Sequence, residues 1–304
     1  MWALYLRMRQ WSEIHKKEFV LFILCLFAFG YFFHGGGANQ NATYDQIRSI
    51  VEYGDLSINR FASNTHDVSV HNGFIFPNKA PGLTFLGVPP GFVLFQLKKV
   101  FLHFMVEDTY FLIVCHLISW LTVGFISAIL CVVLFRFIYD LTQSTITAFL
   151  GTMGYAFGTT AFAYSTILYA HQIAAAFSFT AFYLVFVSKN KEKGYFSSLF
   201  ISGFLAGYSV ITEYPCIFVW FILFLYVFFL FSHNKKYVCF YLAGSLIPAI
   251  ILLFYNYLCY GNPIHLTYFS FFVRNAEIQT GFKETVKTIS FPDITIFYKI
   301  TFDP

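Results

Sequence analysis

The segment from His34 to Pro81 is a long polar loop between apolar segments, and it contains a concentration of hydrogen-bonding and titratable side chains that could do chemistry. Its carboxylates could take a proton, its cations could stabilise a negative charge, and its amides could hold a substrate. Such groups are scarce in the rest of the sequence, so we expect any chemistry to lie here. The polar residues of the loop include Asn39, Gln40, Asp45, Arg48, Asp55, Arg60, His66, Asp67, His71 and Lys79.

Lys79 stands between two prolines in the sequence Pro77-Asn78-Lys79-Ala80-Pro81-Gly82. Proline fixes its own backbone φ, so the segment is stiff and holds the lysine in place. A cation held in this way is well placed to meet a lipid phosphate. The alternative is that Lys79 only anchors the following helix at the membrane interface.

His66, Asp67 and His71 are residue types that bind metals, but the two histidines are an odd number of positions apart. Across a short strand, an odd spacing directs two side chains to opposite faces. The sequence therefore predicts no metal site.

Three local elements are predicted to position the polar loop. Tyr44, Ile47, Ile50 and Val51 recur at helical spacing, which indicates a short surface helix over 41–53 that stops at Gly54. The pair Asn72-Gly73 favours a type I′ turn, so the flanking segments 67–71 and 74–76 should form a β-hairpin. Finally, the apolar segment 82–105 is expected to lie in the outer interface as a helix broken at Pro89-Pro90.

The composition places these elements in a membrane. Hydrophobic residues make up 58% of the chain and charged residues 11%, and the mean hydropathy is +0.65. These values lie outside the range of a soluble domain. The six cysteines contain no CxxC pair and are predicted to be small buried residues. The net charge is +4, and the basic residues are distributed along the chain without forming a basic face. Nucleic acid is therefore not expected as a partner.

The apolar stretches predict an all-α integral membrane protein with about seven transmembrane helices and a large first external loop. Lys and Arg cluster at alternate ends of consecutive stretches, from Lys16 and Lys17 through Arg136 to the groups that begin at Lys189 and Lys235. By the positive-inside rule the N-terminus is cytoplasmic and the loop is external. The predicted spans are 18–34, 110–137, 144–163, 167–188, 196–212, 214–232 and 237–256.

The same pattern divides the chain into five parts. Residues 1–17 form a cytoplasmic N-terminus, 18–34 the first transmembrane helix, and 35–109 an external catalytic loop with its interfacial helices. A six-helix transmembrane bundle follows over 110–256. Residues 257–304 form an external segment, which we expect to precede further helices.

Several short motifs together resemble a known family. Asn39-Gln40, Gly54-Asp55 and Lys79-Ala80-Pro81 stand where the GT-C superfamily of membrane glycosyltransferases has an acidic pair, a Gly-Asp and a Lys-Pro-Pro in its first external loop. The similar proteins include the aminoarabinose transferases of lipid A, the protein O-mannosyltransferases and other bacterial members. His171 in Tyr-Ala-His-Gln and Glu213 in Thr-Glu-Tyr-Pro also have counterparts there.

The resemblance implies transfer of a sugar, with inversion, from a polyprenyl-phosphate carrier to a lipid, glycan or protein acceptor in the cell envelope. It places the enzyme in the bacterial inner membrane, with no obligatory cofactor beyond the lipid-linked donor. In such enzymes the first acid of the pair is the presumed base, and Asn39 cannot fill that role. Asp67 is the candidate replacement, followed by Asp55 and Asp45, although Asp67 could instead cap the hairpin.

Other predicted roles follow from the same reaction. Lys79, assisted by Arg48 or Arg60, is expected to stabilise the departing phosphate. The predicted substrate-binding residues are Gln40, Arg48, Asp55, Arg60, His171 and Glu213. Two alternatives from other functional classes remain. One is a flippase or transporter of lipid-linked sugars, and the other is a non-catalytic binding subunit, which is favoured by Asn39 in place of the expected acid.

Overall fold

Long apolar helices make up most of the protein. The structure, a computed structural model, describes residues 2–101, 107–189, 195–231, 234–265, 267 and 271–272. Its first elements are α1 (Trp2–Tyr31), α2 (Ala38–Tyr53), η1 (Asn59–Asn64), β1 (Val68–His71), β2 (Phe74–Pro77) and α3 (Gly82–Phe101). The bundle that follows contains α4 (Glu107–Ser119), η2 (Trp120–Gly124), α5 (Phe125–Thr142), α6 (Thr145–Gly158), α7 (Ala161–Ser165), α8 (Ala170–Ser188), α9 (Tyr195–Thr212), η3 (Tyr214–Cys216), α10 (Ile217–Leu230), α11 (Lys236–Tyr260) and β3 (Phe271–Phe272).

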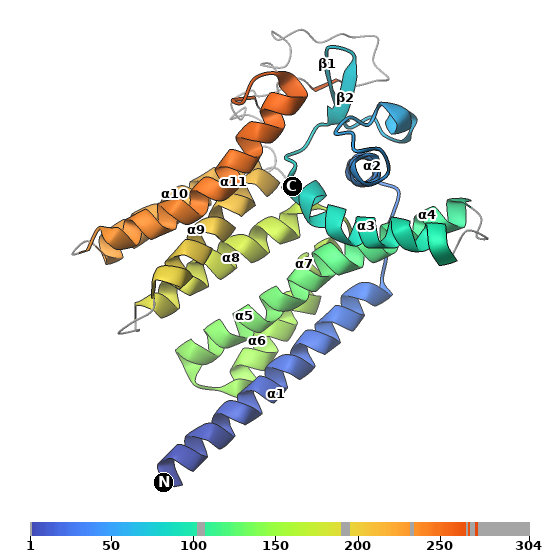
Figure 1. Ribbon diagram of the computed structural model, residues 1–304. Coiled ribbons are helices and arrows are strands. Elements are labelled where there is room, and N and C mark those ends of the chain that lie inside the picture. The colour runs from blue at the N-terminus through green and yellow to red at the C-terminus, as the bar shows by residue number, and fades with distance from the viewer. Residues whose placement is uncertain are drawn as a thin grey trace, which may run out of the picture.

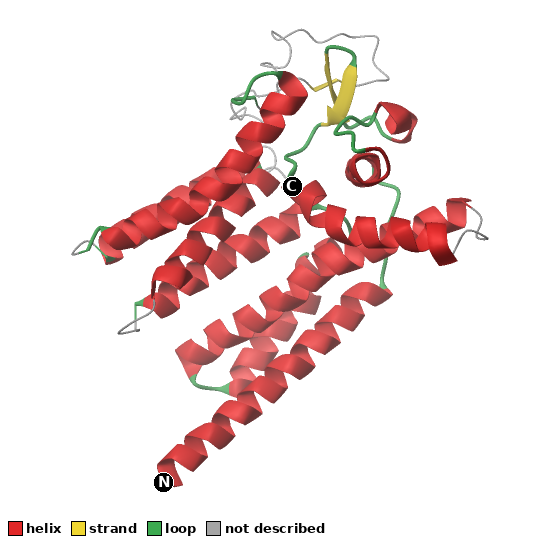
Figure 2. Cartoon of the chain, viewed as in Figure 1, coloured by secondary structure: helices red, strands yellow, loops and turns green. Residues whose placement is uncertain are grey.

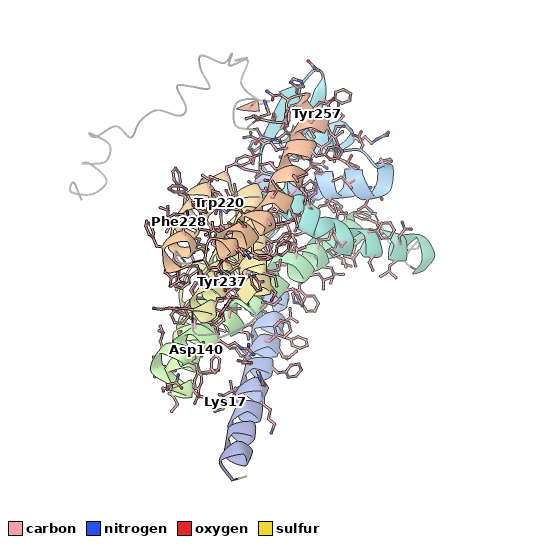
Figure 3. The ribbon with its side chains drawn as sticks, turned by 60° about the vertical axis from the view of Figure 1, so that its left-hand side comes forward. Lys17, Asp140, Trp220, Phe228, Tyr237 and Tyr257 are labelled. Atoms are coloured by element: carbon pink, nitrogen blue, oxygen red, sulfur yellow. The ribbon has the colours of Figure 1, made fainter. Side chains whose placement is uncertain are left out.

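The polar elements gather at one end of this arrangement. Figures 1 and 2 show α2 and the β-hairpin at the end opposite the start of α1 and the turn between α5 and α6. In Figure 3, Tyr257 near the end of α11 lies beside the hairpin, whereas Lys17 and Asp140 lie at the far end. Large apolar side chains are exposed along the helices between the two ends, for example Phe218, which is 72% exposed. Such surfaces are typical of contact with lipid.

Within the described residues, four helices are long and apolar enough to cross a membrane, where the sequence predicts seven spans. The predicted span 144–163 divides into α6 and α7, because Thr159 is extended and its hydroxyl accepts from the backbone N–H of Ala161 at 3.1 Å. Residues 18–31 of the predicted span 18–34 lie in α1, and residues 214–230 of the predicted span 214–232 form η3 and α10, although neither segment is among the four. The four helices are Thr109–Thr142, Ala170–Ser188, Tyr195–Thr212 and Lys236–Tyr260.

The helix over Thr109–Thr142 is longer than the predicted span 110–137 and contains the π-helical turn η2. Its 34 residues would extend about 51 Å, against a hydrocarbon thickness of about 30 Å. The first part, α4, instead packs beside α3, where the Tyr110 hydroxyl donates to the Leu94 carbonyl at 2.6 Å. The indole of Trp120, in the π turn, donates to the Leu26 carbonyl of α1 at 2.8 Å.

The predicted break at Pro89-Pro90 is wrong, because α3 continues through both prolines. The helix is held there by packing against Ile47 of α2. Gly87 and Gly91, one turn apart, let Ile47 approach so closely that a Cβ at either glycine would overlap it. Close packing on both sides of the proline pair thus outweighs the local tendency of proline to end the helix.

The sheet begins with the hairpin of β1 and β2, which pair antiparallel with Val68 opposite Pro77. Asn72 and Gly73 in the turn have φ angles of 49° and 81°, as a type I′ turn requires. A third strand, β3, pairs with β1 on its other side and was not predicted. Its two residues lie in the segment 257–304, most of which falls outside the described residues.

Small residues bring α9 and α11 into close contact. A Cβ on Gly203 of α9 would overlap the Tyr241 carbonyl of α11, and one on Gly244 would overlap the Phe200 carbonyl of α9. The Ser245 hydroxyl bonds to the Gly203 carbonyl at 3.0 Å. Glycine at such crossings lets two backbones approach, which favours helix association in a bilayer.

We therefore expect Gly203→Ala to lower the free energy of unfolding by about 1–3 kcal/mol, because the added methyl group must separate α9 from α11. Gly154→Ala is the matched control, since a Cβ there meets nothing within 4 Å. In that helix interior, alanine should be neutral or stabilising by up to about 1 kcal/mol. Thermal unfolding of both variants in the same detergent measures the difference, and equal effects of the two substitutions would contradict it.

Candidate functional site

A small polar cavity lies at the hairpin end of the molecule. Its volume is about 130 Å³. Parts of the chain that are far apart in sequence form its wall: the start of α2, the segment after β2, the start of α8 and the end of α9. Four residues predicted from the sequence line it together. The full lining is Asn39, Thr43, Lys79, Ala80, Leu83, Tyr169, Ala170, His171 and Glu213.

The first turn of α2 supplies the amide side of the cavity. Asn39 and Thr43 stand one helical turn apart, and the Thr43 hydroxyl donates to the Asn39 carbonyl at 3.2 Å. The start of the helix is tied to the loop below the hairpin, because the Thr65 hydroxyl donates to the Ala38 carbonyl at 2.6 Å. The same hydroxyl accepts from the backbone N–H of Asp67 at 3.1 Å. Asn39 is therefore held in place relative to the base of the hairpin.

Lys79 supplies a cation from the segment that leaves the hairpin. The backbone N–H of Asn78 donates to the Asp67 carbonyl at 3.2 Å and closes the base of the hairpin. The Lys79 ammonium lies 3.7 Å from Asp67 Oδ2. Three residues further on, Gly82 meets the end of α9, where the Tyr208 hydroxyl donates to its carbonyl at 3.0 Å. This contact brings the segment of Lys79 next to the end of α9.

Glu213 is the carboxyl group of the cavity. It follows α9 in an extended conformation, just before the Pro215 that opens η3 and α10. Its Oε1 lies 2.9 Å from Nδ1 of His171, which belongs to the first turn of α8. Burial raises the pKa of Glu213, and the nearby His171 and Lys79 only partly offset this effect. A carboxyl group of this kind can exchange a proton closer to neutral pH than an ordinary glutamate.

Aromatic rings hold the imidazole of His171. The Tyr164 ring meets it edge to face at 5.1 Å, and the Tyr169 ring lies at 6.0 Å. The imidazole is nevertheless 58% exposed, whereas the Glu213 side chain is 19% exposed. The histidine is thus accessible from the cavity mouth and orients the more buried carboxyl group behind it.

Asp67, the predicted base, does not line the cavity. Its contact with Lys79 places a carboxylate beside the cation, and its side chain is 15% exposed. In this position Asp67 can orient Lys79. The residue that faces the cavity with a carboxyl group is Glu213.

Gln40 and Asp55 also lie outside the cavity. Gln40, in the first turn of α2, is buried, and its Oε1 accepts from the backbone N–H of Leu168 at 3.4 Å. Asp55 accepts from the backbone N–H and the hydroxyl of Ser57 at 2.9 and 3.0 Å. Both side chains therefore make contacts that shape the loop.

Neither arginine named by the sequence lines the cavity. Arg48 pairs with Glu52 at 2.7 Å on α2, and its guanidinium lies 4.8 Å from the centre of the Phe61 ring. The guanidinium of Arg60 lies 4.4 Å from the centre of the Tyr53 ring. The cation that the structure brings to the cavity is Lys79.

Asp45, on α2, is a buried carboxyl group outside the cavity. Its Oδ1 accepts from the Asn64 amide at 3.1 Å, whereas Oδ2 has no hydrogen-bond partner among the described residues. Burial raises the pKa of Asp45 to about 7 from its usual 3.8, with Asn64 and Arg48 acting in the opposite direction. The folded protein thus holds this proton over a pH range in which the unfolded chain releases it.

The buried carboxyl group predicts a pH-dependent stability. Between about pH 4 and pH 7 the unfolded state binds fewer protons than the folded state, so stability falls as the pH rises and levels off above about pH 7. We expect Asp45→Asn to leave stability at pH 4 nearly unchanged and to raise it by about 1–3 kcal/mol at pH 8. Thermal unfolding at both pH values measures this, and a variant as pH-dependent as the parent would contradict it.

Sequence reasoning missed two polar members of the cavity. Thr43 follows Asn39 by four residues, but the predicted helix begins at residue 41 and leaves Asn39 outside it. In the structure α2 begins at Ala38, which places the two residues one turn apart on the same helix. Tyr169 precedes His171 by two residues, outside the regular helix, and nothing in the local sequence distinguishes it from the many other tyrosines.

The cavity combines one carboxyl group, one imidazole and one ammonium group with an amide and hydroxyls. Such a set can take a proton from a hydroxyl group and stabilise an anion at the same place. Comparisons with protein-family models, with curated proteins and with solved structures find no match. The chemistry of the cavity is therefore the basis for assigning a function.

Proposed function

We propose that the protein transfers a sugar from a polyprenyl-phosphate carrier to an acceptor hydroxyl on the external face of the membrane. The observation that carries the proposal is the meeting of Glu213, His171 and Lys79 around one cavity at the polar end of an apolar helical bundle. A donor whose leaving group is a lipid phosphate needs an enzyme that meets it at the membrane surface, with a cation for the phosphate and a base for the acceptor.

In the proposed reaction, Glu213 takes the proton of the acceptor hydroxyl as the oxygen attacks the anomeric carbon. The bond between that carbon and the phosphate oxygen breaks, and the single displacement inverts the configuration. The departing polyprenyl phosphate is an anion, which the ammonium of Lys79 stabilises. Because this leaving group needs no proton, the reaction requires neither a general acid nor an obligatory cofactor.

Glu213 is a better candidate for the base than Asp67. It lines the cavity, burial raises its pKa, and His171 fixes one of its oxygens. Asp67 instead contacts Lys79 from outside the cavity lining and would act by positioning the cation. Asn39 and Thr43 offer hydrogen bonds to sugar hydroxyls. Asn39 stands at the first position of the family's acidic pair, and its amide can make such hydrogen bonds although it cannot act as a base.

The proposed setting is the bacterial inner membrane, crossed by about seven helices with a cytoplasmic N-terminus. Lys16, Lys17 and Arg136 favour this orientation, since they precede or follow apolar stretches at the end of the molecule away from the hairpin. The donor is then a lipid-linked sugar in the outer leaflet. The acceptor is a hydroxyl of a lipid, a glycan or a protein of the cell envelope.

The test reconstitutes the full-length protein in liposomes with a radiolabelled polyprenyl-phosphate sugar and a membrane extract as the source of acceptors. Release of unlabelled polyprenyl phosphate together with label on an acceptor would support a transferase. Movement of intact donor between leaflets without bond cleavage would favour a flippase. Binding of the donor without either event would favour a binding subunit, the reading that Asn39 suggests.

A further inference from the structure

Tyr169 is the phenol of the polar cavity, and the reaction proposed above gives it no role. It lines the cavity together with Asn39, Lys79, His171 and Glu213. It precedes α8 in an extended conformation, and its side chain is half-buried. A tyrosine on the wall of a polar cavity offers a ligand both an apolar ring and a hydroxyl group.

The backbone around Tyr169 is tied to the first turn of α2. The backbone N–H of Leu168, the preceding residue, donates to Oε1 of Gln40 at 3.4 Å, and Leu168 is fully buried. The backbone N–H of Tyr169 itself donates to the Ile167 carbonyl at 2.9 Å. Because Gln40 directly follows Asn39, this contact holds Tyr169 in place relative to the amide side of the cavity.

The hydroxyl group of Tyr169 reaches the segment that leads into α2. A Cβ at Gly37 would lie 3.1 Å from this hydroxyl, so the glycine leaves room for the phenol to approach the backbone. Gly37 precedes Asn39 by two residues. The hydroxyl therefore lies close to the helix start that supplies Asn39 to the cavity.

Two neighbouring rings hold the ring of Tyr169. The Tyr164 ring lies 6.2 Å away at 39°, and the His171 ring lies 6.0 Å away at 68°. Tyr164 is outside the cavity lining, so it supports the phenol from behind. His171 also contacts Glu213 at 2.9 Å. The phenol thus stands next to the imidazole that orients the proposed base.

The chemistry of a tyrosine fits a sugar ring, which has C–H groups on its faces and hydroxyls at its edge. The phenol ring is apolar, and its hydroxyl both donates and accepts hydrogen bonds. The cavity volume of about 130 Å³ is well below the ~300 Å³ at which sites for drug-sized ligands begin, so it suits one small ring. In the proposed reaction Lys79 meets the phosphate and Glu213 the acceptor hydroxyl, which leaves Tyr169 for the transferred sugar.

We propose that Tyr169 binds the sugar of the lipid-linked donor, with its ring on a C–H face of the sugar and its hydroxyl bonded to a sugar hydroxyl near Asn39. The donor then carries a single sugar unit. A site that hydrogen-bonds a hydroxyl discriminates against a sugar that lacks it, so Tyr169 contributes to the choice of sugar. This inference rests on the function proposed above, because it takes the transferred group to be a sugar.

The experiment measures the binding of lipid carriers to the full-length protein in detergent by native mass spectrometry. The probes are bare polyprenyl phosphate and the same carrier bearing glucose, mannose or arabinose. In the parent, at least one of these sugars should tighten binding relative to the bare carrier. Tyr169→Phe should reduce this gain by about threefold to tenfold, the contribution of one hydrogen bond. Tyr169→Ala should reduce it by about tenfold or more, because the ring is lost as well. Binding of the bare carrier should stay the same in both variants.

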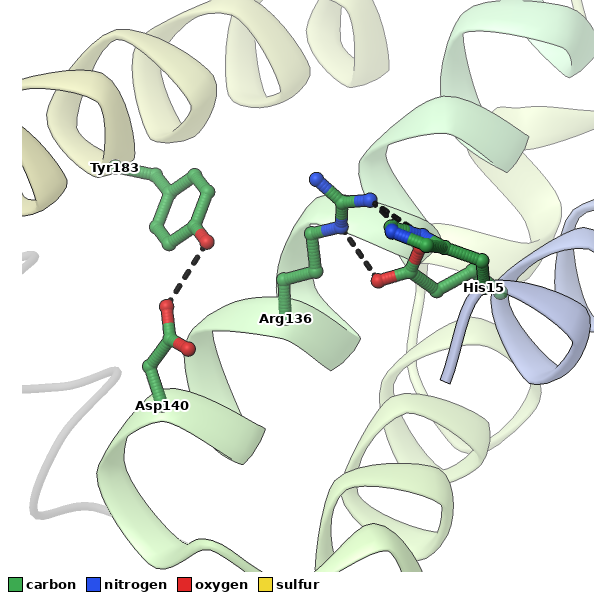
Figure 4. Close-up of polar contacts among 5 residues, drawn as sticks. His15, Arg136, Asp140 and Tyr183 are labelled. Carbon is green, nitrogen blue, oxygen red and sulfur yellow. Dashed lines mark hydrogen bonds and ion pairs between the residues drawn. The ribbon is translucent and has the colours of Figure 1, made fainter. Parts of the chain in front are cut away.

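Tyr183→Phe is the matched control. The Tyr183 hydroxyl donates to Asp140 at 2.9 Å, beside Arg136 and at the far end of the molecule from the cavity (Figures 3 and 4). The substitution therefore removes a tyrosine hydroxyl and its hydrogen bond without touching the cavity. This variant should keep the parent's preference for the sugar-bearing carrier.

Three outcomes would overturn the proposal. An unchanged gain in Tyr169→Ala would remove the tyrosine from the sugar site, and an equal loss for the bare and the sugar-bearing carrier would give it a structural role. Equal binding of all probes by the parent would show that the protein has no site for these sugars.

The transfer assay in liposomes separates this inference from the proposed function. Sugar transfer by a parent whose preference for the sugar does not depend on Tyr169 would contradict the inference alone. A preference that depends on Tyr169, without transfer by the parent, would contradict the transferase and leave a sugar-binding protein.

Discussion

Replacing Glu213 with glutamine should lower the rate of sugar transfer by about 10²–10⁴-fold, the contribution expected of a general base. The amide keeps the size of the side chain and can still accept from His171, so donor binding should change little. The loss should therefore fall on the rate constant of the reaction and not on the affinity for the donor. Release of polyprenyl phosphate from a radiolabelled donor measures it.

The pH dependence gives the same experiment a second readout. A base works when ionised, so transfer should rise with pH through the raised pKa of Glu213 and fall away at lower pH. Glu213→Gln should remove this acid limb. Glu52→Gln is the control, because Glu52 pairs with Arg48 outside the cavity and should leave both the rate and the profile unchanged.

Asp67→Asn tests which of the two carboxylates, Asp67 or Glu213, acts as the base. If Asp67 only positions Lys79, its removal should cost less than the removal of Glu213 and should leave the acid limb in place. If Asp67→Asn instead abolishes transfer while Glu213→Gln leaves it nearly unchanged, Asp67 would be the base and Glu213 would have a role in binding.

Replacing Lys79 with methionine should lower transfer by about 10²–10³-fold, since a fixed cation stabilises the charge that develops on the departing phosphate. Methionine keeps an unbranched apolar stem, so the packing of the segment should persist. Lys79→Arg should retain part of the activity, because it preserves the charge with a different geometry. The measurement is again the release of polyprenyl phosphate at saturating donor.

Loss of Lys79 should also act on Glu213. The ammonium favours the ionised carboxylate, so its removal should raise the pKa of Glu213 further and move the acid limb of the rate profile to higher pH. If Lys79→Met loses activity but its rate falls at the same acidic pH as that of the parent, Lys79 does not affect the pKa of Glu213. Equal activity of parent and variant would remove Lys79 from the mechanism.

The sequence predicts local structure well where one or two residues dominate it. Asn72-Gly73 specifies the hairpin turn, and Gly54 ends α2 in the left-handed conformation. The sequence predicts α3 poorly. Pro89 and Pro90 favour a break in the helix locally, but Ile47, far away in the chain, packs against the neighbouring glycines and the helix continues. The outcome depends on tertiary contacts that no local pattern contains.

The candidate site was predictable as a set of residues but not as a geometry. Asn39, Lys79, His171 and Glu213 can each be named from short motifs, and the structure brings all four to one cavity. Their separation in the sequence hides the pairing of Glu213 with His171, which depends on how α8 and α9 pack. For the same reason the sequence favoured Asp67, in the loop that holds Lys79, as the candidate base, whereas the base proposed from the cavity is Glu213.

The contact of Gly82 with the end of α9 sets how far apart the cation and the carboxyl group can stand. A side chain at this position would overlap the Ile211 carbonyl and the Thr212 hydroxyl, so the start of α3 rests directly on the backbone of α9. Lys79 and Glu213 each lie within three residues of this junction. In the proposed reaction, the distance between Lys79 and Glu213 would depend on how α3 packs against α9. A bilayer that changes the packing of these two helices should then change the rate of transfer without any change in a residue of the cavity.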